Sequence, residues 1–165
     1  MATAQRHLSH YDPAGVPSGA GRRFVLVVSE WNSEITEALR QGARQTLLVN
    51  GAAPEDVIEH WVPGSFELAL GAQLAIEALA PDAVIAIGSI VRGETPHFEY
   101  VCQATTQGIM DVNLRTGVPV IFCVLTDDDM QQARDRSGGR HGNKGVDGAV
   151  AALKMAAMRQ ALREG

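Results

Sequence analysis

Cysteine is scarce in this sequence, and its scarcity limits what the chain can be. Only Cys102 and Cys123 occur among 165 residues, too few for a disulfide scaffold and without the spacing of metal ligands. Both lie inside apolar stretches, which predicts buried, inert thiols. We therefore expect neither a disulfide framework nor a metal site.

An excess of positive charge and a long apolar run are also missing. The formal net charge of −5 gives no general electrostatic reason to bind nucleic acid or an anionic membrane. No stretch approaches the roughly 18 apolar residues of a membrane helix. Residues 1–23 are rich in Gly, Ser, Pro and Ala and lack the apolar region of a signal peptide, so a cytoplasmic protein is expected.

Length and composition favour one domain. Residues 1–21 are predicted to be a flexible N-terminal arm, in which His7 and His10 are exposed polar residues, and residues 22–165 a single α/β domain. Four short apolar runs mark strands at residues 24–29, 57–62, 83–89 and 118–125. The first, third and fourth runs are continuous, as in parallel strands that are covered on both faces.

Helical spacing fills the segments between these strands. The first helix is expected to begin at Asn32 or Ser33 and to stop at Asn50-Gly51. The second is apolar nearly all round, which predicts that it is buried. The third starts with Thr95 as N-cap and Pro96 as first residue, a fourth is capped by Asp127 or Asp128 and runs to Arg134, and the last spans about residues 147–163.

Alternation of strands and helices predicts a three-layer αβα sandwich around a central four-stranded parallel sheet, flavodoxin-like in form. In such sheets a ligand lies beyond the carboxyl ends of the strands. The candidate site therefore lies at residues 30–33, 63–67, 90–97 and 126–129.

The segment Gly93-Glu94-Thr95-Pro96-His97 carries the strongest local signal. The unpaired backbone N–H groups of a helix start form a natural anion site, although a simple helix cap explains the same residues. His97 falls in the first turn, where the helix dipole disfavours an imidazolium and a neutral ring beside a bound anion could move protons. A purely structural histidine is the alternative.

Two further residues near strand ends have both a functional and a structural interpretation. Trp31 directly follows the first strand, where its indole could stack on a planar heterocycle or staple the first helix. Glu67 begins the second helix, where a carboxylate favours the dipole or accepts hydrogen bonds from a polyhydroxyl ligand.

A Gly-rich basic segment, residues 134–145, is either another anion contact or a solvated loop. It is not a Walker A loop, because Lys144 follows Asn143 and precedes Gly145. The carboxylates at residues 127–129 suggest helix capping better than a Mg²⁺ site, since no second acidic cluster follows another strand.

Taken together, five ordered motifs resemble the lumazine synthase family from about Arg22 to the C-terminus. The motifs are Ser29-Glu30-Trp31-Asn32, Val62-Pro63-Gly64-Ser65-Phe66-Glu67, Gly88-Ser89-Ile90-Val91-Arg92-Gly93-Glu94-Thr95-Pro96-His97-Phe98-Glu99-Tyr100, Gly117-Val118-Pro119-Val120-Ile121-Phe122 and Gly142-Asn143-Lys144-Gly145. The resemblance implies condensation of 5-amino-6-(D-ribitylamino)uracil with 3,4-dihydroxy-2-butanone 4-phosphate to 6,7-dimethyl-8-ribityllumazine, with release of phosphate and water. It implies no metal and no redox cofactor.

The resemblance also implies roles for particular residues. His97 would move protons and Arg136 of the adjacent subunit would neutralise phosphate charge, as the two catalytic residues. The substrate-binding residues would be Trp31, Asn32, Ser65, Phe66, Glu67, Ser89, Ile90, Val91, Glu94, Thr95, Phe122 and Lys144. Phe122 and Lys144, like Arg136, would come from the adjacent subunit.

Assembly follows from the same resemblance. The family forms homopentameric rings, and some members assemble twelve rings into a 60-subunit icosahedral shell. The short connection at residues 136–145, with Gly138-Gly139, resembles the shell-forming type, while pentamer, decamer and shell all stay open.

Three other classes share the alternating pattern. A phospho-receiver needs a carboxylate after its third strand, where this chain has Gly88-Ser89-Ile90, and a flavodoxin needs a phosphate loop where it has Glu30-Trp31-Asn32. A binding-only or shell-only relative could dispense with His97 and Arg136, so the presence of both favours catalysis.

Overall fold

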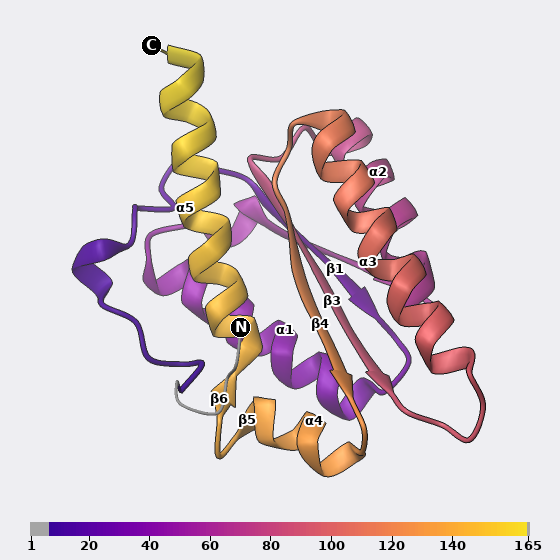
Figure 1. The fold of residues 1–165 in the computed structure, drawn as a ribbon. Helices are drawn as coiled ribbons and strands as arrows, with labels where there is room; N and C mark the ends of the chain where they lie inside the picture. The colour runs from indigo at the N-terminus through magenta and orange to yellow at the C-terminus, as the bar shows by residue number, and fades with distance from the viewer. Residues whose placement is uncertain (1–6, 165) are drawn as a thin grey trace.

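The computed structural model describes residues 7–164, which form one parallel sheet between two pairs of helices (Figure 1). In chain order the strands of the sheet and the helices that flank it are β1 (Phe24–Ser29), α1 (Ser33–Val49), β2 (Val57–Val62), α2 (Leu68–Leu79), β3 (Ala83–Val91), α3 (His97–Thr116), β4 (Val120–Asp127) and α5 (Lys144–Glu164). Between β4 and α5 lie α4 (Met130–Arg136) and a hairpin of β5 (Ser137–Gly139) and β6 (Gly142–Asn143). Short 3₁₀ turns occupy η2 (Pro13–Gly15), η3 (Pro54–Asp56) and η4 (Ser65–Glu67).

The strands are parallel and lie in the order β2-β1-β3-β4, which confirms the predicted four-stranded sheet and three-layer architecture. Helices α1 and α5 cover one face, and α2 and α3 cover the other (Figure 1). No helix among residues 7–164 is both long and apolar enough to cross a membrane.

Burial on two faces explains why the central strands have no polar alternation. In β1, Phe24, Leu26 and Val28 pack with α1 and α5, while Val25 and Val27 pack with α2 and α3. Every residue of β1 is buried. Neither face can then reach water, and the loops that leave the carboxyl ends of the strands are the parts free to bind a ligand.

Several element ends differ from those predicted. β3 runs two residues beyond the expected Ser89, to Val91, and β4 starts at Val120 because Pro119 cannot donate a backbone hydrogen bond. The N-cap of α4 is Asp129, whose Oδ1 accepts from the backbone N–H of Gln132 at 2.9 Å, and not Asp127 or Asp128. α4 continues to Arg136, and α5 begins at Lys144 instead of near residue 147.

The prediction that the second helix is buried all round is wrong for the single chain. Leu68, Ala72 and Ala75 of α2 are buried, but Leu70 and Leu74 on its other side are more than half exposed. The sequence pattern shows which side chains are apolar, but it does not show whether residues of the same chain cover them. An apolar outer side of this kind is typical of a helix that packs against another subunit.

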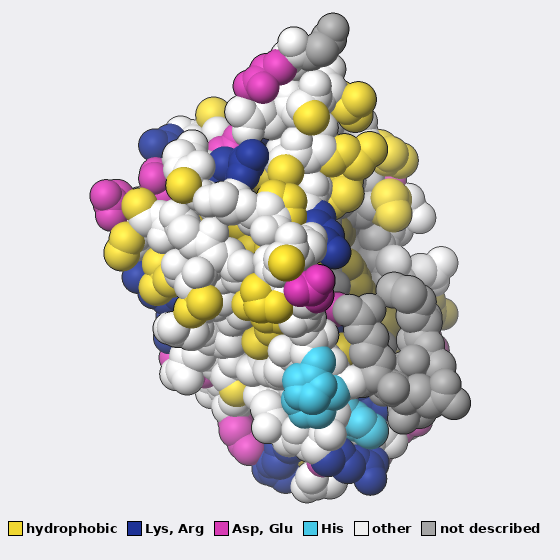
Figure 2. Space-filling view, turned by 90° about the vertical axis from the view of Figure 1, so that its left-hand side faces the viewer, with side chains coloured by type: hydrophobic (Ala, Val, Ile, Leu, Met, Phe, Trp, Pro, Cys, Tyr) yellow, Lys and Arg dark blue, Asp and Glu magenta, His cyan; other side chains and the backbone are white. Residues whose placement is uncertain are grey.

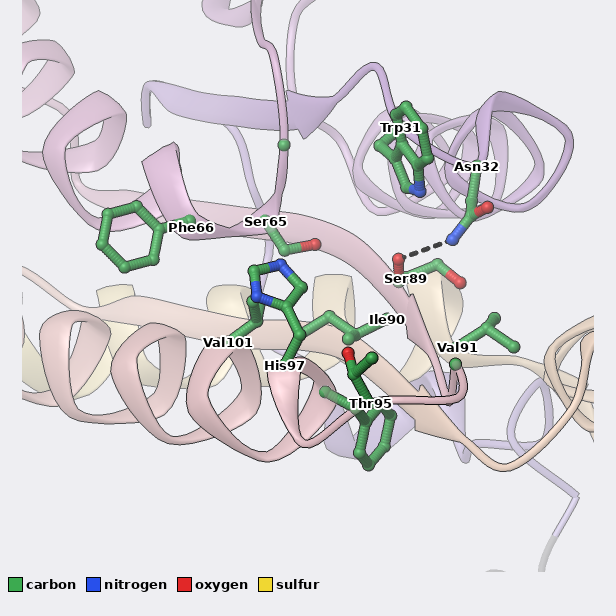
Figure 3. A pocket seen from close by; sticks show the side chains of 13 residues that line it. Trp31, Asn32, Ser65, Phe66, Ser89, Ile90, Val91, Thr95, His97 and Val101 are labelled. Atoms are coloured by element: carbon green, nitrogen blue, oxygen red, sulfur yellow. Dashed lines mark hydrogen bonds between the residues drawn. The ribbon is translucent and has the colours of Figure 1, made fainter.

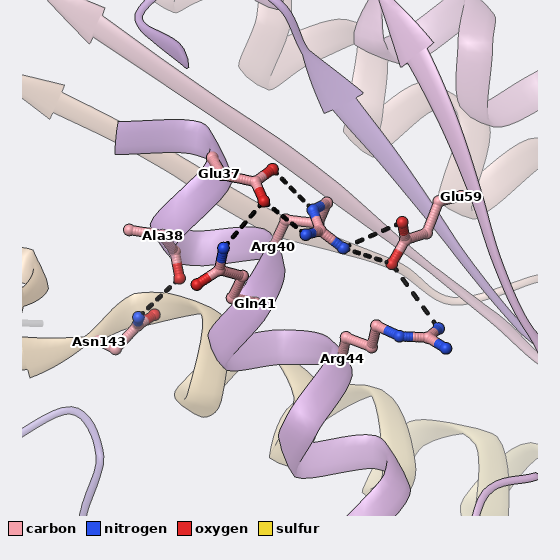
Figure 4. Close-up of polar contacts among 7 residues, drawn as sticks. All are labelled: Glu37, Ala38, Arg40, Gln41, Arg44, Glu59 and Asn143. Carbon is pink, nitrogen blue, oxygen red and sulfur yellow. Dashed lines mark hydrogen bonds and ion pairs between the residues drawn. The ribbon is translucent and has the colours of Figure 1, made fainter. Parts of the chain in front are cut away.

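The hairpin between α4 and α5 was not predicted, and Asn143 fixes it to α1. The Asn143 side chain donates to the Ala38 carbonyl at 2.8 Å (Figure 4). It also accepts from the backbone N–H of Gly145 at 2.8 Å. Gly145 allows this close approach, because a Cβ there would lie 1.9 Å from the carbonyl oxygen of Leu39. The start of α5, with Lys144, is thereby held against α1.

Residues 7–11 also contact this hairpin. Leu8 is buried and its backbone N–H donates to the His141 carbonyl at 2.7 Å, while Ser9 Oγ accepts from the backbone N–H of Asn143. The rings of His7 and His10 stack with centroids 4.2 Å apart; His10 is exposed as expected, and His7 is half-buried. Figure 2 views the molecule from the left-hand side of Figure 1 and shows histidine side chains gathered near the bottom of that face. The flexible arm and the boundary after residue 21 stay predictions.

An ion-pair network joins α1 to the edge strand β2 (Figure 4). Arg40 donates to Glu37 on the preceding helical turn and to Glu59 of β2 at 2.8 Å, and Arg44 lies 3.7 Å from the same Glu59 carboxylate. The hydrogen bonds from Arg40, together with one from Gln41, lower the pKa of Glu37 to about 2.

This network predicts a pH-dependent contribution to stability. Because the pKa of Glu37 is lowered on folding, its contribution is fully present above the ordinary value of 4.5 and is lost as the pH falls towards about 2. Glu37→Gln should therefore destabilise the protein at neutral pH by less than about 1 kcal/mol, as for other partly exposed pairs. Urea denaturation between pH 7 and pH 2.5 should show the two proteins converging below pH 4.5.

The matched control is Glu37→Gln in an Arg40→Gln background, where the main partner is gone. There the substitution should have little effect at any pH. An equal effect of Glu37→Gln with and without Arg40 would contradict the ion-pair explanation.

Candidate functional site

A pocket of about 410 Å³ opens at the carboxyl ends of β1 and β3, beside the start of α3 (Figure 3). This volume is in the range of small-molecule sites. Its lining residues are Trp31, Asn32, Gly64, Ser65, Phe66, Ser89, Ile90, Val91, Gly93, Thr95, His97, Phe98 and Val101. The lining is mainly apolar with a few polar groups, the usual composition of a site for an organic ligand.

Trp31 stands at one side of the pocket mouth, directly after β1. The backbone N–H groups of Glu30 and Trp31 donate to the carbonyls of Val62 and Pro63, which prolongs the pairing of β1 with β2 beyond the strand. The backbone of Trp31 is therefore fixed while its indole stays 71% exposed. A rigid, exposed indole at a pocket is suited to stacking on a flat ligand.

Asn32 lies between β1 and α1, where the sequence suggested a helix cap. It occupies the N-cap position but has left-handed backbone angles, φ 58° and ψ 47°, and its side chain makes no capping hydrogen bond. Instead, Nδ2 donates to the carbonyl of Ser89 at 2.9 Å (Figure 3). The Asn32 side chain thus ties the start of α1 to the end of β3, at the floor of the pocket.

Ser65 and Phe66 enter the pocket from η4. The hydroxyl of buried Thr105 on α3 donates to the Ser65 carbonyl at 3.2 Å. Gly88 of β3 permits Ser65 to approach the sheet, because a Cβ on Gly88 would lie 2.6 Å from Ser65 Oγ. The Phe66 ring is largely exposed at the edge of the pocket.

The segment before α3 differs from the predicted cap by one residue. α3 begins at His97 with Pro96 at the cap position, where φ is −62° and ψ 0°, and no side chain caps the helix. Thr95 thus precedes the cap position, and Thr95 and His97 both line the pocket. Helix α3 therefore directs its uncapped N-terminal end, with its partial positive charge, towards this cavity.

Arg92 lies at the start of the loop between β3 and α3, and its side chain contacts both α3 and the residue after β4. Its guanidinium donates to Asp128 at 2.8 Å and to Glu99 of α3, and lies 4.2 Å from the centre of the Phe98 ring. The hydrogen bond from Arg92 lowers the pKa of Glu99. These exposed contacts fix the loop geometry more than they stabilise the fold.

Five of the residues assigned by resemblance lie outside this pocket. Glu67 is the N-cap residue of α2, and Glu94 is exposed in the loop before α3. Phe122 lies in a separate hollow with Glu99, Cys102 and Thr126. Arg136 and Lys144 stand at either end of the hairpin, apart from the lining of the pocket of their own chain.

Three cations of the basic segment are paired within the chain. Arg134 binds Glu34 and Arg140 binds Asp135, each at 2.8 Å, while Lys144 Nζ lies 2.6 Å from Asp147. Arg136 Nη1 is 3.6 Å from Asp127, a longer contact.

Cys123 is buried as predicted, and burial raises its pKa to about 12. Cys102 is only half-buried, and its pKa is also raised by burial. Neither thiol has the lowered pKa of a nucleophile. Within residues 7–164 no group of three or more His, Cys, Asp or Glu side chains is placed to hold a metal ion.

Sequence reasoning placed Gly64 and Gly93 within the candidate segments but gave them no role, and it missed Phe98 and Val101 as pocket residues. The glycines are part of the recognised motifs but offer no side chain to single out. Phe98 and Val101 fit the apolar spacing of the third helix, and this spacing does not distinguish core residues from pocket residues. The available signal was that Val101 lies four residues after His97, on the same side of α3.

The fold and the pocket together define a class: an α/β protein with a small-molecule site at the carboxyl edge of a parallel sheet, next to a helix N-terminus suited to an anionic group. Comparison with known proteins gives the family. Residues 21–160 match the family described as 6,7-dimethyl-8-ribityllumazine synthase. The chain belongs to this family.

Curated relatives are similar in sequence to this chain over nearly its whole length. Proteins named 6,7-dimethyl-8-ribityllumazine synthase from Flavobacterium psychrophilum, Christiangramia forsetii and Porphyromonas gingivalis are each 51% identical to it. Each alignment covers 97% of this chain, and 85%, 96% and 99% of the respective relative.

The geometry of Asn32 predicts how two substitutions should differ. Asn32→Gly removes the hydrogen bond to Ser89 together with the Cβ, and should lower the free energy of unfolding by at most about 1 kcal/mol. Asn32→Ala loses the same hydrogen bond but keeps a Cβ in the left-handed region without the polar group that makes Asn tolerated there, and should cost about 1 kcal/mol more. Urea denaturation at one fixed protein concentration measures both, since assembly makes stability depend on concentration. Equal losses for the two variants would contradict the assigned backbone strain.

Proposed function

We propose that this chain condenses 5-amino-6-(D-ribitylamino)uracil with 3,4-dihydroxy-2-butanone 4-phosphate to 6,7-dimethyl-8-ribityllumazine, a transferase reaction of riboflavin biosynthesis. Its family membership supports the overall reaction. The structural observation that carries the proposal is one pocket that joins an exposed indole to the N-terminal end of α3 and to His97. A flat pyrimidine and a phosphate group fit these two features.

The pocket residues bind the two reactants side by side. Trp31 stacks on the pyrimidine, with Asn32, Ser89, Ile90 and Val91 forming the surrounding wall. Ser65 and Glu67 hold the hydroxyl groups of the ribityl chain, and Phe66 covers them. Glu94 and Thr95, just before the N-terminus of α3, bind the phosphate through backbone N–H groups.

Most of the rate acceleration comes from proximity, because holding an amine beside a ketone converts a bimolecular step into an effectively unimolecular one. The 5-amino group adds to the ketone and loses water to form a Schiff base. Phosphate then leaves, and the ribityl-bearing nitrogen closes the ring with loss of a second water. His97 moves the protons in these steps, from its place at the pocket edge.

The other half of each site comes from the next subunit. Phe122 covers the bound ring, and Arg136, with Lys144 nearby, neutralises the phosphate. These three residues lie outside the pocket of their own chain. In a closed ring with head-to-tail interfaces, each subunit gives one half-site to each neighbour.

We propose a homopentamer that further assembles into a 60-subunit icosahedral shell. The exposed apolar side chains of η4 and α2, Phe66, Leu70 and Leu74, together with Tyr100, Met110 and Leu114 of α3, support a subunit interface on this face. Apolar exposure on this scale is costly for a monomer in water. The short hairpin after α4 supports the shell.

The proposed reaction is tested by turnover. The purified chain mixed with both substrates should produce the absorbance of the lumazine, and His97→Ala should lower kcat by roughly 10- to 1,000-fold with assembly intact, because it removes a positioned proton carrier. His60→Ala, at an exposed position of the edge strand β2, is the control and should leave kcat unchanged. Absence of product with the unchanged chain would refute the reaction, and an unaltered kcat in His97→Ala would remove His97 from it.

The shared site predicts complementation. His97→Ala and Arg136→Ala are each expected to have strongly reduced but measurable activity, and co-expression should restore part of what is lost. Random mixing places two intact half-sites together at about a quarter of the interfaces, so activity should approach that fraction. Light scattering verifies that the mixed rings have formed.

Mixing the two preformed variants without dissociation is the control and should restore nothing. Verified mixed rings with no more activity than either parent would mean that each site lies within one chain.

A further inference from the structure

Three consecutive carboxylates, Asp127, Asp128 and Asp129, lie at the carboxyl end of β4, and they contact different groups. Asp129 caps α4, and Asp128 accepts a hydrogen bond from Arg92. Asp127 does neither; its side chain is buried, with the residue 4% exposed. The structural tasks of this segment are thus carried out by its two neighbours, and the Asp127 side chain needs a separate explanation.

Within the described residues, 7–164, Arg136 is the one cation paired with the Asp127 carboxylate. Oδ1 lies 3.6 Å from Arg136 Nη1, and buried Oδ2 has no hydrogen-bond partner among residues 7–164. Burial raises the pKa of this carboxyl, an effect that Arg136 opposes. A buried carboxylate with one oxygen unsatisfied costs stability, so the fold alone gives no reason to keep it.

Arg136 is held on one side and open on the other. Its Nη1 donates to the Gln132 carbonyl of α4 at 3.0 Å and faces Asp127. Nε and Nη2 make no hydrogen bond within the described part of the chain, residues 7–164. A guanidinium has five N–H donors, so most of them are left for another group.

We propose that Asp127 is a positioning residue that orients Arg136 towards the phosphate of the ketone substrate in the adjacent subunit. This role rests on the proposed function. By attracting Nη1, the carboxylate restricts the long arginine side chain to one arrangement and leaves its other donors for the phosphate oxygens. Without Asp127, the Arg136 side chain populates other rotamers. Phosphate binding must then order this side chain, and the lost conformational entropy weakens the affinity for phosphate.

The test measures KM for both substrates in the assembled enzyme. Asp127→Ala should raise KM for the phosphorylated ketone by roughly 10-fold, the scale of one charge-assisted contact, and leave KM for the pyrimidine unchanged. Asp127→Asn should raise it less, because the dipole of its amide oxygen still attracts Nη1. The inhibition constant of inorganic phosphate should rise in parallel, which gives a readout independent of turnover.

A double-mutant cycle separates positioning from a general structural role. In an Arg136→Ala background, Asp127→Ala should produce no further change in KM for the ketone, since the side chain that it orients is absent. The melting temperature of Asp127→Asn should equal or exceed that of the parent, because an unsatisfied buried carboxylate is removed.

Asp56→Asn is the matched control. It breaks another carboxylate–arginine contact, with Arg23 at 3.8 Å, at the start of β2 on the opposite edge of the sheet. Both KM values should stay unchanged in this variant.

Failure of the role and failure of the proposed function give different results. A parent protein that makes no lumazine refutes the function and this role with it. An active parent whose Asp127→Ala variant keeps KM for the ketone, raises both KM values equally, or has the same effect without Arg136 overturns the positioning role alone.

Discussion

Burial of β1 and β3 on both faces is the constraint on which the rest of the structure depends. Strands with no solvated face must be covered by helices on either side, and the crossovers that place these helices make the sheet parallel. All four strands then end at one edge. Trp31, Ser65 and His97 meet there although they are far apart in the sequence, because each follows a strand that ends beside the others.

Much of this could be predicted from the sequence, because the responsible signals are local. The continuous apolar run of β1 and the Asn50-Gly51 stop of α1 each act over a few residues, and these two elements appear where the signals place them. The pocket follows from the same logic, since topology alone assigns ligand binding to the carboxyl edge of the sheet.

Features that depend on distant partners were not predictable in this way. Thr95 and Asn32 both have side chains that favour caps, yet neither caps a helix: Pro96 takes the cap position of α3, and the Asn32 side chain finds the Ser89 carbonyl across the sheet. The outer side of α2 was misjudged for a related reason. Leu70 and Leu74 are as apolar as core residues, and the sequence does not distinguish burial within a chain from burial between chains.

The segment at residues 127–129 shows how one short stretch can serve two sites. Through Asp128 it contacts Arg92, which holds the loop carrying Thr95 and His97 of the same chain's pocket. Through Asp127 it faces Arg136, the cation proposed for the next subunit's phosphate. Asp129 also fixes the start of α4. The positions of Arg92 and Arg136 therefore both depend on the carboxyl end of β4. In a ring with shared sites, the end of β4 therefore sets the geometry of two neighbouring active sites, and a displacement there would change the phosphate contacts of both.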